Sequence, residues 1–505
     1  MLLIFLMVAV FSHLDSSLKL RKRESIYTIF AFGVFVVTAI LMYIRCFYGT
    51  ELTDEAYYVS EAKEMLNGNI PFAINNSSKA LGYTFLLVCV EFIYSLFVPS
   101  LEGVFLFTRL CFVTFKIIIS IIIYFILKKS LRKADALLLV GILLPISYLS
   151  IQNFSYNTIP IWTTLLSGTF LFDVLEQTPW NKDLELILAG FIVAIGCFAN
   201  PGWGLALVVF LILMIVRIPG KNNRIRAIFL FYGSVFAEVL IVAIPIIMQT
   251  SVGELCYGLY RLFIHSFPME SLAPHKNWHD TLMSFLDTIT LNLNIFSVVL
   301  IAVFALSVEY IFKYRGKPNV KQYWMQLLPL AFLANVSLAV YKGRGSDQSN
   351  IIAFTALIYI VVFMIMGAFK EEKIIWYLGV VPALFSVAEI ILIDASANIS
   401  RFAHSFTIVI PLIYVLLKQK SKWTHVIAAL TAAILILATI YANFHYVYRD
   451  DIIQNLDYRV ESGVYKGIYT TADRAHDLPE LEEYLNGVIG EGESYAFRDN
   501  VPSAY

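Results

Sequence analysis

The stretch that decides the fold is Leu81–Val98, with the sequence LGYTFLLVCVEFIYSLFV. It is almost long enough to cross a bilayer, whose hydrocarbon core of about 30 Å needs about 20 apolar residues in a helix. If the run crosses, every later loop moves to the opposite side of the membrane. If it lies along the surface, the later loops keep their side, so this one segment sets the topology.

The composition is that of a membrane protein. Of the 505 residues, 59% are apolar and only 15% are charged, which leaves too little polar surface for a soluble fold. The formal net charge is zero, with 37 basic and 37 acidic residues, so the charge balance gives no case for binding nucleic acid. The five cysteines are odd in number and scattered, which disfavours a disulfide framework and a thiolate metal site.

Apolar runs long enough for membrane-spanning helices recur along the chain. Reading runs of about 17 to 24 residues as helices predicts an all-α polytopic membrane protein with about 13 transmembrane helices. The candidate spans are 26–48, 104–127, 136–151, 159–175, 184–199, 203–217, 227–248, 290–312, 323–341, 351–369, 374–393, 405–417 and 424–447.

The basic residues decide whether 81–98 is a further span. With this run on the surface, the loops on one side carry 22 Lys and Arg residues and the short loops opposite carry eight. Such an excess marks the cytoplasmic side. If 81–98 crossed, the cluster Lys128–Lys133 would lie outside while the cluster Lys19–Arg23 stayed inside. We therefore expect 81–98 to be a juxtamembrane helix on the outer face.

This topology puts the unusual sequence outside. It gives a transmembrane domain with two large outer loops, followed by an outer segment: 1–447, with loops 49–103 and 249–289, and then 448–505. The outer segment holds a helix-like run at 478–485 and a strand-like run at 494–497, so we expect a small extracytoplasmic α/β segment. One helix and one strand do not bury a core of their own, and we expect that the chain is cut short there.

The first outer loop contains an acidic helix. Thr53 or Asp54 can cap its N-terminus, and Pro71 prevents its continuation. One stripe of the helix is polar at helical spacing: Asp54, Tyr57, Glu61 and Glu64. The helix can therefore lie on the membrane and present carboxylates to a site, although a solvated amphipathic helix has the same pattern.

Several residues of this loop form a recognisable series. In chain order they are Asp54-Glu55-Ala56-Tyr57, Lys63-Glu64-Met65, Gly68, Pro71, Lys79, Gly82-Tyr83 and Arg109. The series resembles the first outer loop of the GT-C membrane glycosyltransferases, in particular the lipid A aminoarabinose transferases and protein O-mannosyltransferases. The resemblance implies transfer of a sugar from a polyprenyl-phosphate carrier to a glycan, lipid or protein acceptor. It also implies a bacterial plasma membrane with the active site on the extracytoplasmic face.

The resemblance implies roles for individual residues. Asp54 would accept the proton of the acceptor hydroxyl, with Glu55 as its neighbour in the catalytic pair. A sugar on a lipid phosphate leaves a phosphate monoester behind, so the site needs positive charge for the departing phosphate. Direct displacement would invert the anomeric carbon. The candidate phosphate and substrate contacts on the outer face are Lys79, Arg109, Lys342, Arg344, Arg401 and Tyr57.

Histidines cluster in the second outer loop. His265, His275 and His279 fall within a short stretch, and the last two are one helical turn apart. With a carboxylate of the first loop they could hold a divalent metal ion on the phosphate; interfacial histidines without a metal are the alternative. The chain also departs from the related families, which have a Glu before the aligned Lys, a later Lys and a second outer acid. Here these positions are Ser78, Asn200-Pro201, and Asn153 with Asn157.

Two charges lie near the middle of predicted spans, Lys116 and Glu238. A lone central charge costs about 2.5 to 3.5 kcal/mol on insertion scales, so we predict an ion pair between them that joins two spans; a transport path is the alternative. Two further functions stay open: a transporter or flippase of a lipid-linked substrate, and a surface polysaccharide polymerase or ligase. The sequence has no glycine motif of a nucleotide site, which favours a lipid-linked sugar over a nucleotide sugar.

Overall fold

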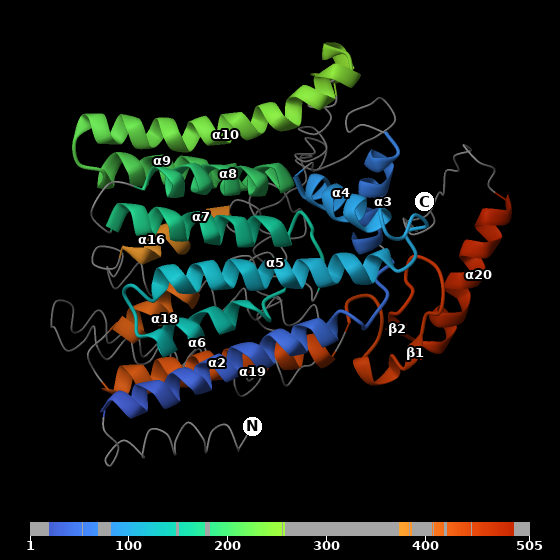
Figure 1. Cartoon of the computed structure of the whole chain (residues 1–505), viewed down its shortest axis with the longest axis horizontal. Coiled ribbons are helices and arrows are strands. Elements are labelled where there is room, and N and C mark those ends of the chain that lie inside the picture. Colours follow the sequence, from blue (N-terminus) through green and yellow to red (C-terminus); the bar gives the residue numbers. More distant parts are fainter. Residues whose placement is uncertain are drawn as a thin grey trace, which may run out of the picture.

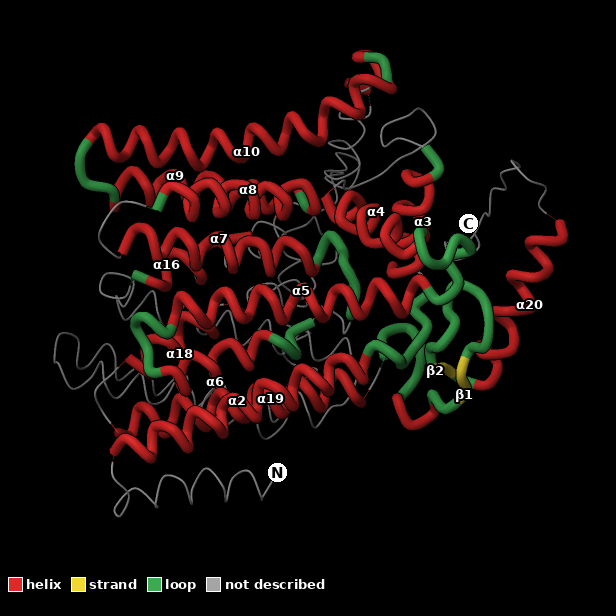
Figure 2. Tube along the Cα trace, viewed as in Figure 1, coloured by secondary structure: helices red, strands yellow, loops and turns green. Residues whose placement is uncertain are grey.

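The computed structural model is mostly helical, with long apolar helices lying side by side in a bundle (Figure 1). It describes residues 20–52, 54–68, 82–147, 151–176, 182–254, 256–257, 373–382, 384–385, 407, 409–418, 422–445 and 447–488. The shorter elements gather at one end of the bundle (Figure 2). This architecture confirms a helical fold that is compatible with a membrane protein.

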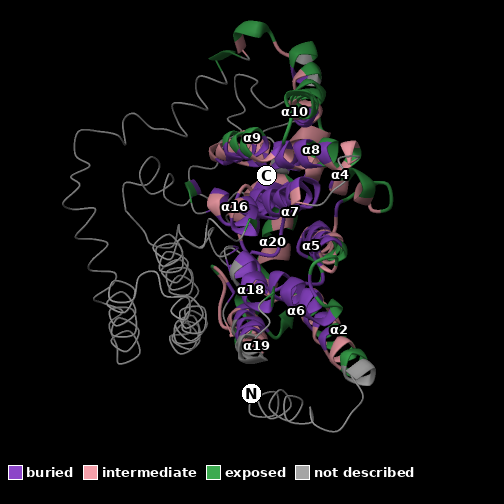
Figure 3. Cartoon of the chain, turned by 90° about the vertical axis from the view of Figure 1, so that its left-hand side faces the viewer, coloured by how far each residue is buried: buried purple, intermediate pink, exposed green. Residues whose placement is uncertain are grey.

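The bundle helices differ in how deeply they are buried. They are α2 (Leu20–Arg45), α5 (Val104–Leu127), α6 (Lys133–Leu143), α7 (Thr158–Glu176), α8 (Asp183–Ala199), α9 (Leu205–Arg217), α10 (Lys221–Gln249), α16 (Ile374–Leu378), α18 (Val409–Lys418) and α19 (Lys422–His445). Four of them, α2, α5, α7 and α10, are long and apolar enough to cross a bilayer. In α7, 100% of the 18-residue apolar segment is buried, compared with 22% of the corresponding segment in α2 and 17% in α10. Helix α7 therefore forms the centre, and α2 and α10 present apolar outer faces (Figure 3).

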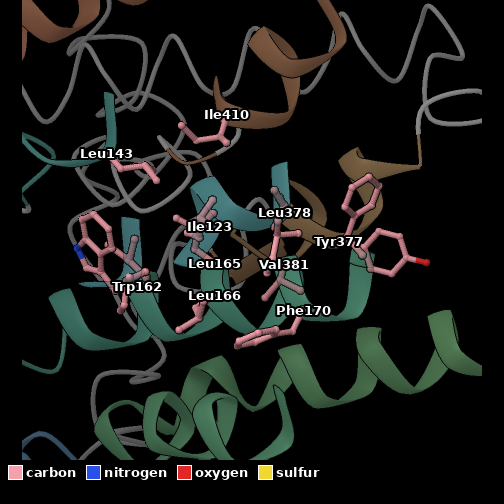
Figure 4. Close-up of a cluster of buried hydrophobic side chains, with 14 of the residues drawn as sticks. Ile123, Leu143, Trp162, Leu165, Leu166, Phe170, Tyr377, Leu378, Val381 and Ile410 are labelled. Carbon is pink, nitrogen blue, oxygen red and sulfur yellow. The ribbon is translucent and has the colours of Figure 1, made fainter. Parts of the chain in front are cut away.

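The core is built around α7, which is buried on all sides. Phe170 of α7 and Ile123 of α5 belong to one buried cluster with Leu378 of α16 (Figure 4). Gly168 allows α16 to approach, because a Cβ atom at this position would lie only 2.4 Å from the carbonyl oxygen of Tyr377. A larger residue there would push the two helices apart.

Basic connections gather at one end of the bundle. The α5–α6 connection and the α9–α10 connection lie at the same end, opposite the shorter elements (Figure 2). Basic residues flank both connections: Lys128, Lys129, Arg132, Lys133, Arg217, Lys221, Arg224 and Arg226. Both basic connections therefore lie at the same end of the bundle, as expected if their basic residues are on one side of the membrane. The predicted spans between 290 and 369 lie outside the described residues.

The run that decides the topology forms α4 (Gly82–Ser95), which packs against α3 (Asp54–Leu66). Both helices lie at the end of the bundle opposite the basic connections (Figure 1). At 1.5 Å per residue, α4 is about 21 Å long, which is shorter than the hydrocarbon core of about 30 Å. It lies beside the end of the bundle instead of running through it (Figure 1). Exposed apolar side chains lie on the last turns of α4 and just after it: Phe92 and Ile93 on the helix, then Leu96 and Phe97.

The C-terminal segment docks onto the first outer loop. Strand β1 (Tyr458–Arg459) pairs with β2 (Tyr469–Thr470), and α20 (Ala472–Val488) follows, longer than the helix expected at 478–485. The strand expected at 494–497 lies outside the described residues. The side chains of this segment pack on α3 and α5 and share a buried cluster with them. The ring of Tyr465 stacks on Phe105, with centroids 4.1 Å apart.

The predicted ion pair between Lys116 and Glu238 is not formed. The Lys116 ammonium group donates to the carbonyl oxygen of Ile146 at 3.1 Å and to Oε1 of Gln152 at 3.4 Å. Glu238 lies on α10, which packs against α8 and α9. The sequence placed both charges at mid-span but could not show that α8 separates their helices.

We expect the two ends of the bundle to face opposite sides of the membrane. The test uses a chain in which the five native cysteines are replaced by serine, with one cysteine introduced as Asp477→Cys on α20 or Lys221→Cys at the start of α10. Both positions are exposed. A membrane-impermeant maleimide should label Asp477→Cys in intact cells and Lys221→Cys only in opened membranes. Equal labelling of both in intact cells would contradict the topology.

Candidate functional site

A buried ion pair between Glu55 and Arg109 ties α3 to the bundle. Glu55 stands in the first turn of α3 and Arg109 in the second turn of α5. The guanidinium Nε donates to Glu55 Oε1 at 2.7 Å, and Nη2 donates to the other carboxylate oxygen. Arg109 is 4% exposed and Glu55 1% exposed. The pair is therefore bidentate and removed from water, the geometry in which an arginine binds a carboxylate most strongly.

Arg109 also binds the chain that leads from α2 to α3. Its Nη1 atom donates to the carbonyl oxygen of Cys46 at 3.0 Å and to that of Tyr48 at 3.4 Å. Its Nη2 atom donates to the carbonyl oxygen of Gly49 at 2.8 Å. All three guanidinium nitrogens are thus occupied by acceptors of the protein, and a single side chain joins α2, α3 and α5.

Asn153 completes the surroundings of Glu55. Its Nδ2 group donates to Glu55 Oε1 at 2.9 Å and to Thr108 Oγ1 at 3.0 Å. On the other side, the carboxylate of Glu51 accepts the backbone N–H of Glu55 at 2.5 Å and so caps α3. An ionised carboxylate at position 153 could not donate a hydrogen bond to Glu55, whereas the amide of Asn153 does. The sequence analysis identified Asn153 only as a position where the resembled families have an acid, and it did not predict this contact.

A second polar layer lies next to this pair, at the ends of α2 and α19. Arg45 Nε donates to the carbonyl oxygen of Asn443 at 2.6 Å. The Asn443 side chain accepts from Gln152 Nε2 at 2.9 Å, and Gln152 in turn accepts from Lys116. The layer links α2, α5 and α19 through groups that are all buried. None of these contacts was predicted, because each joins residues that are far apart in the chain.

Asp54 differs from the neighbouring Glu55 in its burial and in its hydrogen bonding. Its side chain is half-buried, and within the described part of the chain it forms no hydrogen bond and no ion pair. Its negative charge acts on Tyr448, whose pKa is raised to about 12 by burial first and by Asp54 second. It also acts on Tyr58 of α3. The acidic pair therefore divides: Glu55 is fully bonded inside the protein, and Asp54 has its carboxylate available.

Tyr57, expected as a substrate contact, lies at the junction of α3 and α4. It is half-buried, and burial followed by the carboxylate of Glu61, to which it is hydrogen-bonded, raises its pKa well above the ordinary value. Glu61 also accepts a long hydrogen bond of 3.5 Å from Thr84 of α4. Tyr57 and Glu61 thus take part in the contact between the two outer helices.

The remaining predicted site residues lie outside the described residues. They are the basic candidates Lys79, Lys342, Arg344 and Arg401 and the metal candidates His265, His275 and His279. In the ranges that the structure does describe, no group of three or more His, Cys, Asp or Glu side chains is arranged to hold a metal ion. The fold thus brings together Asp54, Glu55, Tyr57 and Arg109 of the predicted set.

Comparison with known proteins adds no relative: no protein-family model, curated protein or solved structure matches this chain.

The Glu55–Arg109 pair predicts a large effect of single substitutions on stability. Removing one member of a buried ion pair costs about 3 to 5 kcal/mol, because the other charge stays buried without compensation. Glu55→Gln should therefore lower the melting temperature of the purified protein in detergent. The matched control is Glu102→Gln, which removes a carboxylate that pairs with Lys466 at 3.2 Å and is 36% exposed. An exposed pair contributes about 0 to 1 kcal/mol, so equal shifts for the two variants would contradict the anchoring role.

Proposed function

We propose that this chain is a membrane glycosyltransferase that moves a sugar from a polyprenyl-phosphate carrier to an acceptor at the outer membrane face. The observation that carries the proposal is the half-buried carboxylate of Asp54 at the head of α3, which has no hydrogen bond or ion pair among the described residues. It lies at the end of the bundle opposite the basic connections, which the charge rule assigns to the outside. The proposal includes about 13 spans over residues 1–447 and an extracytoplasmic site.

In this proposal Asp54 and Glu55 have separate tasks. Asp54 is the general base, because no side chain or backbone group of the described residues binds its carboxylate, which can accept a proton from an incoming hydroxyl group. Glu55, expected as its catalytic neighbour, holds α3 on the bundle through Arg109. Arg109, expected as a phosphate contact, serves the same positioning role. A base fixed in this way keeps its orientation, since a small misplacement at a reacting centre costs a large part of the rate.

The chemistry needs one base and one cationic site. The acceptor hydroxyl oxygen attacks the anomeric carbon and gives its proton to Asp54. A new carbon–oxygen bond forms while the bond between the anomeric carbon and the phosphate oxygen breaks, with inversion. The leaving group is the polyprenyl phosphate, whose developing charge is stabilised by nearby cations. Lys79, Lys342, Arg344 and Arg401 remain the predicted cations, and a divalent ion on His265, His275 and His279 remains the predicted alternative.

The polar groups inside the bundle support an enzyme over a transporter. A transporter of a lipid-linked substrate needs polar side chains that line a path through the membrane. Lys116 instead donates to a carbonyl oxygen and to Gln152, and its ammonium group lies 5.4 Å from the centre of the Phe112 ring. Lys116 thus takes part in the packing of the interior, whereas Asp54 lies at the end of the bundle.

Loss of the Asp54 carboxylate should abolish sugar transfer while the protein still folds. General-base catalysis contributes about 10²- to 10⁴-fold to a reaction rate. The rate of sugar transfer by Asp54→Asn should therefore fall by that factor. The measurement is mass spectrometry of surface glycans and of polyprenyl-phosphate sugars in a strain that lacks the gene and is complemented with each variant. The deletion and Asp54→Asn should both accumulate the lipid-linked sugar and lose one surface decoration.

The matched control is Asp477→Asn, the same chemical change at a side chain of α20 that is 75% exposed. It should restore the decoration fully. Equal rescue by Asp54→Asn would reject Asp54 as the base. A deletion strain with unchanged glycans and unchanged lipid-linked sugars would reject the glycosyltransferase itself.

A further inference from the structure

A buried carboxyl group on α4 has no polar partner among the described residues. Glu91 is 0% exposed. Both of its carboxylate oxygens are buried, and in the part of the chain that the structure describes neither one has a hydrogen-bond partner or an ion-pair partner. Buried carboxylates in proteins are normally hydrogen-bonded or paired with a cation. Glu91 is an exception to this rule, and the packing of α4 has to accommodate it.

Glu91 belongs to the stripe of α4 that faces the protein. Thr84, Leu87 and Glu91 recur at helical spacing, and all three are buried. Leu87 is part of the main hydrophobic core. Cys89 and Phe92, by contrast, are exposed. The carboxyl group of Glu91 is therefore enclosed in the interface between α4 and its neighbours and is kept away from water.

The interface joins α4 to α3, α5 and α8. Other contacts hold α4 near its two ends. At the start, Thr84 Oγ1 donates a long hydrogen bond of 3.5 Å to Glu61 of α3. At the end, the ring of Tyr94 stacks on Phe107 of α5, with centroids 4.6 Å apart. Glu91 lies between these two contacts in the helix, so its protonation state acts on the middle of the interface.

The helices packed against α4 provide little charge that compensates Glu91. Their charged and titratable side chains are Asp54, Glu55, Tyr57, Tyr58, Glu61, Lys63 and Glu64 on α3, Arg109, Cys111, Lys116 and Tyr124 on α5, and Asp183, Glu185 and Cys197 on α8. Burial raises the pKa of Glu91 to about 9, although the charge of Lys63 acts in the opposite direction. A carboxyl group without a partner in such surroundings keeps its proton, because the ionised form loses far more hydration than the neutral form.

We propose that Glu91 is a proton-binding site that makes the docking of α4 on α3, α5 and α8 depend on pH. With the proton bound, the interface is neutral and α4 stays docked. Ionisation places an unpaired charge in the interface, and α4 then opens locally to let water reach the carboxylate. Because α3 carries Asp54 and Glu55 in its first turn, the opening loosens the support of that helix. This inference does not depend on the proposed function.

The direction of the pH effect follows from the proton balance. In the opened state the carboxyl group of Glu91 has an ordinary pKa near 4.5, whereas in the docked state burial raises the pKa to about 9. Between these two values the docked state binds more protons than the opened state. The stability that α4 docking contributes is therefore complete below the lower pKa and is lost as the pH rises towards the higher one.

The first test is the melting temperature of the purified full chain in detergent, measured from about pH 5 to about pH 9. Glu91→Gln and Glu91→Leu cannot ionise, so both should melt above the wild type at the alkaline end, and the difference should shrink towards the acidic end. Glu102→Gln, which removes a carboxylate that is 36% exposed, should differ from the wild type by the same small amount across the range.

The second test follows the opening of α4 itself. In a chain whose five native cysteines are replaced by serine, Leu87→Cys places one thiol on the buried stripe. At about pH 8 a maleimide should label it about tenfold faster with Glu91 than with Glu91→Gln. The thiol is the same in both chains, so its own ionisation cancels. A chain that keeps only the exposed Cys89 should be labelled at equal rates with Glu91 and with Glu91→Gln.

Three results would overturn the inference. If Glu91→Gln and Glu91→Leu both melt below the wild type at every pH, or fail to fold, then an ionised Glu91 stabilises the protein. If the difference in melting temperature does not change with pH, Glu91 does not exchange its proton on opening. If Leu87→Cys is labelled at the same rate with and without the Glu91 carboxyl group, ionisation does not open α4.

Discussion

The buried pair of Glu55 and Arg109 holds together three parts of the chain that are distant in sequence. The guanidinium joins the carboxylate of α3 to the carbonyl oxygens of Cys46 and Gly49. A buried charge pair of this kind stabilises only when its remaining hydrogen-bonding positions are filled. Here the amide of Asn153 fills one of them. The position of Asp54 follows from this, because it is the residue directly before the anchored Glu55.

The C-terminal segment depends on the same anchored loop. Its backbone is hydrogen-bonded to the loop after α2: the N–H of Gly49 donates to the carbonyl oxygen of Tyr469 at 2.7 Å. Asp450 and Arg474 then bind Thr50 from two sides. The end of the bundle opposite the basic connections is therefore one packed unit, in which the loop after α2 meets the turn after α19.

Sequence periodicity and charge predicted the helices well because both act locally. The bounds of α5 match the expected span 104–127, and α4 forms a helix within the run 81–98. The contacts were beyond reach for a physical reason: an ion pair or a hydrogen bond between Glu55 and Arg109, or between Asp450 and Thr50, leaves no periodic signal. The prediction of an ion pair between Lys116 and Glu238 was wrong for the same reason. The acidic pair at 54–55 was found by its motif, but only the three-dimensional arrangement distinguishes the bonded acid from the available one.

The most direct test of this account is a double-mutant cycle on Glu55 and Arg109, with thermal stability in detergent as the readout. Glu55→Gln, Arg109→Gln and the double variant are compared with the wild type. The account predicts that the double variant loses much less stability than the sum of the two single losses, because each single change strands the partner charge; coupling in contacting pairs reaches about 0.5 to 3 kcal/mol. Additive losses would show that the pair does not act as a unit and would contradict the anchoring of Asp54.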